Sequence, residues 1–139
     1  MKICLSGIIM IALFGLASSA QAQVAVIGNK SLGSAALDLT KVKNLYLLVS
    51  NEVNGSKVKL FDVQSDTPTK AKFYEALGKP ASEAKKVWLK AKLTGNGTPP
   101  EAVGSEDDVL AKVESTPGAI GYISAEKAHS KVKTLLIIN

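Results

Sequence analysis

A loop rich in hydroxyl groups, Gln64-Ser65-Asp66-Thr67-Pro68-Thr69, carries the residue types in this chain that best suit ligand binding. It follows a stretch that predicts a strand and precedes one that predicts a helix. A helix N-terminus presents unpaired N–H groups and a partial positive charge, so it can hold an oxyanion without any catalytic residue. Open α/β folds place ligands where strands end in this way. The loop therefore predicts either a site for a small anion or hydroxyls that only cap the helix.

A second polar stretch, which contains Asn29 and Ser31, follows an apolar strand candidate at Val24 to Ile27. Asn-Lys-Ser is also ordinary loop composition, so a purely structural role is the alternative. His129 is the single histidine and lies among polar residues, which predicts a surface position. With one isolated histidine and no paired carboxylates at catalytic spacing, the sequence offers no nucleophile–base constellation. We therefore expect no enzyme activity, no cofactor and no metal site.

The elements that must position these residues follow from hydrophobic spacing. Lys57 to Val63 alternates as a partly covered strand does, and the hydroxyl loop then leads into a helix that runs to Leu77. From Ser82 a further helix has apolar residues at helical spacing, with Trp88 as a core anchor rather than a ligand-stacking group. Val132 to Ile138 is almost wholly apolar and β-branched, which predicts a closing strand inside the sheet.

The stretch from Ser105 to Ser124 predicts half of an α/β layer. Ser105 and Asp108 have the spacing of a capping-box variant, and the apolar residues after them recur at helical spacing. Thr116-Pro117-Gly118 ends that helix, and Ala119 to Ile123 is typical of a buried strand. Within this strand Gly121 leaves room for the close approach of another backbone or a ligand.

Residues 38 to 63 allow two interpretations. Asp38 or Thr40 has the position of a cap for a helix that runs through Leu47. Asn54-Gly55 is a strong turn signal between two apolar runs, Leu45 to Val49 and Val58 to Val63, and this pattern favours a β-hairpin instead. Local pattern alone does not decide between them.

The first 22 residues have the pattern of a signal peptide. Lys2 forms a short basic region, Ile8 to Leu16 is apolar, and Ala20-Gln21-Ala22 resembles a cleavage site. We therefore expect a periplasmic or secreted protein whose mature domain spans residues 23 to 139. The single cysteine, Cys4, would leave with the leader, so no disulfide and no thiol nucleophile is expected in the mature domain.

The cations are all lysines, and the chain contains no arginine, the usual bidentate partner of phosphate. Without Lys2 the balance is 16 lysines against 12 acidic side chains, a net charge of +4. Many lysines alternate with apolar residues, which favours a solvated face over an anion-binding or nucleic-acid-binding patch. Aromatic residues are also too few to stack bases, so no nucleic-acid partner is expected. The alternating lysines are Lys41, Lys43, Lys57, Lys59, Lys70, Lys72, Lys85, Lys86, Lys90, Lys92, Lys131 and Lys133.

Four stretches in order resemble the phosphate-binding proteins of ABC importers, and most of all their short single-lobe relatives. Pro117 to Tyr122 resembles the family's P-G-A-I-G-Y signature, and Asp38 to Leu47 resembles its L-S-x-x-x-L-x-x-I-F-L-G-K helix. Phe73 to Gly78 resembles F-x-x-x-x-L-G. Trp88 followed by Leu93 to Pro100 resembles W-x-x-x-x-F-T-G-x-G-x-P-P. The resemblance spans roughly residues 24 to 125.

This resemblance implies an α/β fold, a three-layer sandwich like one lobe of a type II periplasmic binding protein, and a helix rather than a hairpin before Leu47. It also implies that hydroxyls and amides hold phosphate or a similar small anion. The family's loop R-S-D-G-S-G-T-T matches Ser65 and Asp66, Thr67 and Thr69 are approximate substitutes, and Gln64 stands in place of the arginine. Asn29 and Ser31 follow the strand that crosses between lobes in the family.

One lobe leaves an anion exposed to water, so tight binding would require a homodimer or a partner such as an ABC permease. The alternative is an envelope interaction module that keeps the lobe without transport and docks on an envelope protein or sensor.

Overall fold

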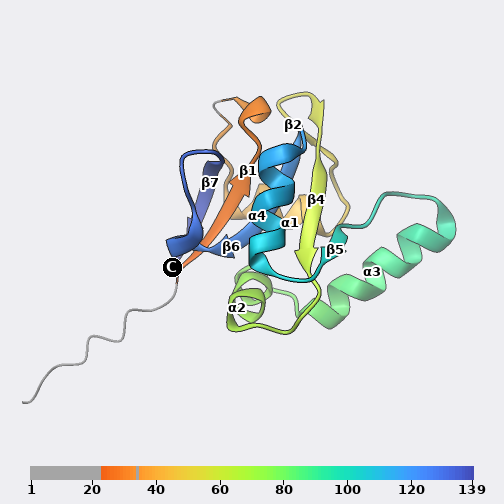
Figure 1. The fold of residues 1–139 in the computed structure, drawn as a ribbon. Helices are drawn as coiled ribbons and strands as arrows, with labels where there is room; N and C mark the ends of the chain where they lie inside the picture. The colour runs from red at the N-terminus through yellow and green to blue at the C-terminus, as the bar shows by residue number, and fades with distance from the viewer. Residues whose placement is uncertain (1–22, 34) are drawn as a thin grey trace, which may run out of the picture.

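The computed structural model describes residues 23–33 and 35–139, which form an α/β domain with one five-stranded sheet (Figure 1). The predicted signal peptide and Cys4 lie outside the described residues. No helix in the described part is long and apolar enough to cross a membrane. In chain order the elements are β1 (Val24–Gly28), η1 (Lys30–Leu32), α1 (Leu39–Tyr46), β2 (Glu52–Val53), β3 (Ser56–Lys57), β4 (Lys59–Val63), α2 (Pro68–Ala76), α3 (Ala81–Thr94), β5 (Glu101–Val103), α4 (Glu106–Ser115), β6 (Ala119–Ser124), η2 (Ala125–Lys127) and β7 (Lys133–Ile138).

The strand order in the sheet is β5-β4-β6-β1-β7. β4 pairs in parallel with β5 and β6, whereas β1 runs antiparallel to both of its neighbours, β6 and β7. The carboxyl ends of β4, β5, β6 and β7 therefore share one end of the sheet, and β1 ends at the other. This arrangement decides which loops can meet.

The prediction that β7 lies inside the sheet is wrong, because β7 forms one of its two edges. A register shift interrupts its pairing with β1 between Val26 and Ile27. The segment after η1 runs along its outer side, where Leu37 N donates to Leu135 O at 3.2 Å. Apolar side chains on both faces are typical of an interior strand, but here a neighbouring loop covers part of the edge instead.

Helices cover both faces of the sheet and give the predicted three layers (Figure 1). Successive side chains of a strand point to opposite faces, so Gly121 faces one helical layer and Tyr122 faces the other. On the Gly121 side α4 packs so closely that a Cβ there would collide with Val109. The close approach predicted at Gly121 is thus made by a helix. On the opposite face Tyr122 packs against Tyr46 and Phe73, which belong to α1 and α2.

The core on the Tyr122 face is aromatic. The rings of Phe73 and Tyr122 are stacked, with centroids 4.0 Å apart, and Tyr46 and Tyr74 meet Phe73 edge to face. Trp88 of α3 packs beside Tyr74, and its indole Nε1 donates to Tyr46 O at 2.7 Å. Trp88 is therefore the core anchor that its helical spacing predicts.

Both interpretations of residues 38 to 63 hold in part. Asp38 caps α1 by accepting from Lys41 N, so the helix implied by the resemblance is present. The Asn54-Gly55 turn also forms a hairpin, but a short one that joins only β2 and β3. Both turn residues have positive φ, 50° and 78°, which is the geometry that favours Asn-Gly at this place.

Candidate functional site

The hydroxyl loop, Gln64–Thr69, lies where the sequence predicts it, at the carboxyl end of β4 and the start of α2. Its first residue continues the sheet, since Gln64 N donates to Val103 O at 2.8 Å. The side chains of Ser65 and Asp66 are exposed. A pocket of about 590 Å³ opens beside the loop, between Asp66 and Thr67 on one side and the turn from Gly78 to Ala81 on the other. The loop is therefore accessible to a small ligand.

The start of α2 is capped by the loop itself. Thr67 Oγ1 accepts from Lys70 N at 3.1 Å, and Thr67 O accepts from Ala71 N at 3.0 Å. Pro68 is the first residue of the helix and has no N–H to offer. Much of the donor capacity that makes a helix start attractive to anions is thus absent or occupied. The capping interpretation accounts for the position of Thr67, and Thr69 is itself buried.

Beneath the loop lies a buried polar group that we call the Asp62 cluster, formed by Asp62, Lys70, Tyr74 and Tyr122. Lys70 is only 2% exposed, and its ammonium donates to Val63 O at 2.7 Å and lies 3.5 Å from Asp62 Oδ2. Asp62 Oδ1 accepts from the hydroxyls of both Tyr74 and Tyr122. Each buried charge has a partner, as low-dielectric surroundings require.

Tyr122 of the Asp62 cluster, together with Tyr46, also completes the backbone of β4. Beyond Leu60 the pairing of β4 with β6 ends, and side chains take over its backbone groups. The Tyr46 hydroxyl donates to Phe61 O at 2.8 Å, and Val63 N donates to the Tyr122 hydroxyl at 3.3 Å. Without these hydroxyls the backbone of this strand would be buried and unsatisfied.

Burial raises the pKa of the three tyrosine hydroxyls. For Tyr74 and Tyr122 the loss of water is the largest cause, and the negative charge of Asp62 raises the pKa further. The pKa of Tyr46 is also raised well above its ordinary value, again chiefly by burial and then by Asp62. All three hydroxyls therefore stay protonated and serve as donors.

The Asp62 cluster was not predicted from the sequence. The expectation that Lys70 is one of the solvated lysines is wrong, and no role was predicted for Asp62. The signal that points to Asp62 is one acidic residue among the apolar residues of Leu60 to Val63. For Lys70 the signal is its place one turn before Tyr74 on the same helix face, because residues four apart are neighbours on a helix.

Asn29 and Ser31 lie at the opposite end of the sheet from the hydroxyl loop. Asn29 N donates to Ala119 O, and Ala119 pairs with Lys59 at the start of β4. Gln64 is five residues further along, roughly 16 Å away at the usual rise of a strand. One small anion cannot contact both groups, so the predicted residues fall into two separate places.

The polar groups of Asn29 and Ser31 hold the end of α4. Asn29 Nδ2 donates to Val113 O at 2.8 Å and to Glu114 O at 3.0 Å, and Asn29 Oδ1 accepts from Ser31 N. Ser31 Oγ accepts from Gly118 N at 2.9 Å. These contacts use both amide hydrogens of Asn29, which leaves it little capacity for a ligand. His129 is exposed, as predicted.

Carboxylates surround the end of the sheet that carries the hydroxyl loop. The loop contains Asp66, and α4 begins here with Glu106, Asp107 and Asp108. Glu106 accepts from Ser124 N, and Asp107 pairs with Lys127 at 3.2 Å. Within residues 23–33 and 35–139, no three His, Cys, Asp or Glu side chains gather to hold a metal ion. This electrostatic setting weakens rather than strengthens the attraction for an anion.

A further pocket, of about 640 Å³, lies at the other end of β4. Its floor contains Leu45 and Leu60, and its rim contains Lys57, Asn96 and the ion pair of Lys59 with Glu101 at 3.0 Å. No residue predicted from the sequence as a ligand contact lines it.

Comparison with protein-family models finds no match, and neither does comparison with curated protein sequences. Solved structures do share this fold. A protein from Clostridium perfringens, described as a phosphate ABC transporter substrate-binding protein with bound phosphate, aligns with a TM-score of 0.67 and 19% identity. The aligned region covers 82% of this chain and 45% of that one.

An ABC-type phosphate transport receptor from Vibrio cholerae aligns with a TM-score of 0.63 and 15% identity, over 82% of this chain and 47% of that one. A possible phosphate binding protein from Planctomyces limnophilus aligns with a TM-score of 0.50 and 14% identity, over 75% of this chain and 37% of the other. This chain thus spans less than half the length of each of these proteins. It has the fold of one lobe of the periplasmic substrate-binding proteins of phosphate ABC transporters.

Proposed function

We propose that this domain binds phosphate or a similar small oxyanion, without covalent chemistry, at the hydroxyl loop. The observation that carries the proposal is the position of the loop. It follows a sheet strand and opens a helix, in a fold shared with one lobe of a protein whose structure contains phosphate. Strand ends of this kind are where α/β folds bind ligands. In this proposal the protein is a periplasmic or secreted non-enzyme, exported by the predicted signal peptide.

The expected contacts are few. Ser65 supplies an exposed hydroxyl, Gln64 supplies a neutral amide in place of a cation, and the loop backbone supplies N–H groups. The ammonium of Lys70, beneath the loop, is already paired with Asp62. Loss of a charge-assisted contact weakens anion binding by roughly 1.5–3 kcal/mol. We therefore expect weak binding unless a second copy of the domain, or a partner such as an ABC permease, covers the loop.

Isothermal titration with phosphate at low salt, with sulfate for comparison, tests the proposal. A protein that begins at Gln23 is suitable because residues 24 to 138 contain the whole described core. Ser65→Ala should weaken phosphate binding at least several-fold without changing stability, since no hydrogen bond of its hydroxyl is seen in the described part of the chain. Ser56→Ala removes a similarly exposed hydroxyl from β3, at the other end of β4, and is the matched control.

The absence of heat up to millimolar phosphate would overturn the proposal. So would equal binding by the Ser65→Ala and Ser56→Ala variants, because the loop would then not be the site. Thr67→Ala is a poor probe, since loss of the cap alone costs about 1 kcal/mol of stability.

A second candidate function is an envelope interaction module that keeps the lobe without binding a ligand. The capping of α2 by Thr67, together with Pro68 at its first position, favours this candidate. It predicts no phosphate binding and a stable domain, and it directs the search toward partners in the envelope or a sensor protein.

A further inference from the structure

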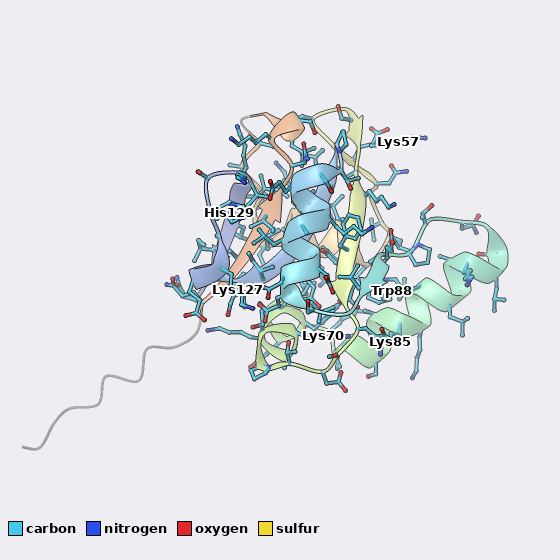
Figure 2. All side chains as sticks on the ribbon, in the orientation of Figure 1. Lys57, Lys70, Lys85, Trp88, Lys127 and His129 are labelled. Carbon is cyan, nitrogen blue, oxygen red and sulfur yellow. The ribbon has the colours of Figure 1, made fainter. Side chains whose placement is uncertain are left out.

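One side of helix α3 faces solvent and does not pack against the rest of the domain. Its inner side packs on the domain through Ala84, Trp88 and Ala91, and the helix extends away from the sheet (Figures 1 and 2). At 100° per residue the opposite side carries Ser82, Lys86, Leu89 and Leu93. We call this side, with its flanking lysines, the outer face of α3.

Two pairs of lysines border the leucines of the outer face. By the same helical geometry Lys85 and Lys92 lie on one side of the leucines, and Lys86 and Lys90 lie on the other. All four side chains are exposed. The outer face is therefore an apolar strip between two rows of positive charge.

The charges of the outer face are not neutralised within the described part of the protein. Among the described residues, none of these four lysines has a carboxylate within salt-bridge distance. Glu83 is the one acidic residue of the helix, and it lies in the first turn. By contrast Lys59, Lys127 and Lys131 each have an acidic partner elsewhere in the domain. A surface that binds the outer face of α3 must therefore be negatively charged.

The leucines of the outer face are unusually exposed for their type. Leu89 is 58% exposed and Leu93 is 78% exposed, so most of each side chain meets water. Val49 is 73% exposed and lines the same pocket as Asn96 and Gly97, which lie in the loop after the helix. A partner that removes these side chains from water gains the corresponding hydrophobic free energy.

The residue types favour a lipid surface over a protein surface. Protein interfaces are enriched in tryptophan, tyrosine and arginine and depleted in lysine, whereas the outer face consists of lysines, two leucines and Ser82. Helices that lie in a bilayer interface have apolar side chains toward the acyl chains and lysines on the polar side. The long lysine stems allow the ammonium groups to reach headgroups while the leucines insert.

We propose that the outer face of α3 docks the domain on the surface of an anionic phospholipid bilayer. Leu89 and Leu93 insert among the lipid chains at the interface, and the four lysines contact the negatively charged headgroups. The inner side of α3 stays packed on the domain, so docking requires no unfolding. This surface is independent of the hydroxyl loop and of anion binding there.

Vesicle co-sedimentation tests the proposal with the protein that begins at Gln23. Vesicles with about 30% phosphatidylglycerol should bind the protein at low salt, whereas pure phosphatidylcholine vesicles should not. Raising the salt to about 1 M should release the protein, because the Debye length then falls to about 3 Å.

A fourfold variant, Lys85→Gln, Lys86→Gln, Lys90→Gln and Lys92→Gln, should bind several-hundred-fold more weakly. Each lysine near an anionic surface strengthens binding roughly fivefold, and glutamine keeps the helix propensity. Its matched control is Lys30→Gln, Lys41→Gln, Lys57→Gln and Lys112→Gln, which removes the same charge from exposed positions elsewhere. The control variant should keep most of the binding.

The double variant Leu89→Gln and Leu93→Gln keeps all the charges and should bind about tenfold more weakly. Equal weakening by the two fourfold variants would overturn the proposal, since net charge alone would then explain binding. So would unchanged binding of the leucine variant. Binding to soluble polyglutamate but not to vesicles would also overturn it and would identify an acidic protein as the partner.

Discussion

The same side chain has opposite surroundings in two neighbouring helices. In α2 the ammonium of Lys70 is buried, 3.5 Å from Asp62 and bonded to Val63 O. In α3 the ammonium groups of Lys85, Lys86, Lys90 and Lys92 point to solvent without a carboxylate partner in the described part of the chain. The two helices are joined by a short turn, yet one lysine belongs to the core and four lie on the surface.

This difference shows that the groups around a lysine decide whether it lies in the core or on the surface. A buried ammonium needs a carboxylate and further hydrogen bonds, and the Asp62 cluster supplies both. An exposed ammonium needs neither, so it is free to meet a partner.

The largest effect is expected from Lys70→Met. It leaves the carboxylate of Asp62 buried without its cation, which should lower the free energy of unfolding by roughly 3–5 kcal/mol. Urea denaturation followed by circular dichroism measures the loss. Lys85→Met is the matched control and should change stability by less than about 0.5 kcal/mol.

Removing both charges sharpens this result. The double variant Asp62→Asn and Lys70→Met should recover part of the loss, because no unpaired charge then remains buried. Similar small effects of Lys70→Met and Lys85→Met would contradict the contrast between the two helices.

High pH should destabilise the protein through its three tyrosines. Their pKa values are raised in the folded state, so above pH 10 the unfolded chain releases protons that the folded chain keeps. Stability is then lost as the pH rises, by about 1 kcal/mol per tyrosine between pH 10 and pH 11, or about 3 kcal/mol in total. Urea denaturation at the two pH values measures the loss.

Tyrosinate absorbance gives an independent measure, because the chain has only three tyrosines and all are buried. The signal should appear together with unfolding and not before it. Tyr122→Phe should reduce the loss of stability between the two pH values by about one third. Titration of a tyrosine in the folded protein near pH 10 would contradict the description of the Asp62 cluster.

Asn29→Ala tests a buried polar group without charge. The substitution removes the donors to Val113 O and Glu114 O, and it should cost roughly 1–3 kcal/mol, less than the loss of Lys70. Asn29→Asp should be no better, because a negative charge would face carbonyls at the C-terminus of α4. Thermal unfolding compares both variants, and a neutral Asn29→Ala would show that water replaces the amide.

The smallest effect is expected on the outer face of α3. Leu93→Gln should leave the free energy of unfolding within about 0.5 kcal/mol of the parent, because this leucine is 78% exposed. Ala91 lies two residues before Leu93, on the buried side of the helix, so Ala91→Gln should lower the free energy of unfolding by more than about 1 kcal/mol through overpacking. Equal losses in the two variants would show that the outer face contributes to the core.

Local signals in the sequence predicted the helix starts and the buried strand well. Ser105 caps α4 by accepting from Asp108 N, as its spacing indicated, and Ala119 to Ile123 is buried. Asn54-Gly55 forms its turn. Each of these features depends on residues within one or two turns of each other, so the local sequence contains the information. The single-lobe architecture came from resemblance rather than from any such pattern.

Features that depend on strand direction were not predicted. Asn29, Ser31 and Ser65 each follow a strand, so they were expected in one site. Because β1 runs antiparallel to β4, they lie at opposite ends of the sheet. The apolar composition of β7 predicted an interior strand, but the order of the strands makes it an edge. Lys70 was misjudged because its partner, Asp62, lies on a different element. Pairings between elements leave no periodic trace in a single sequence.

The position of β1 in the sheet has a consequence for how the chain folds. Among the described residues it is the first strand along the chain, yet its two neighbours, β6 and β7, are the last two. This side of the sheet therefore forms only when the two ends of the described domain meet, which raises the contact order and slows folding. A chain truncated before Lys133 would keep β1 beside β6 but leave its other edge unpaired, a template for aggregation rather than a smaller stable domain.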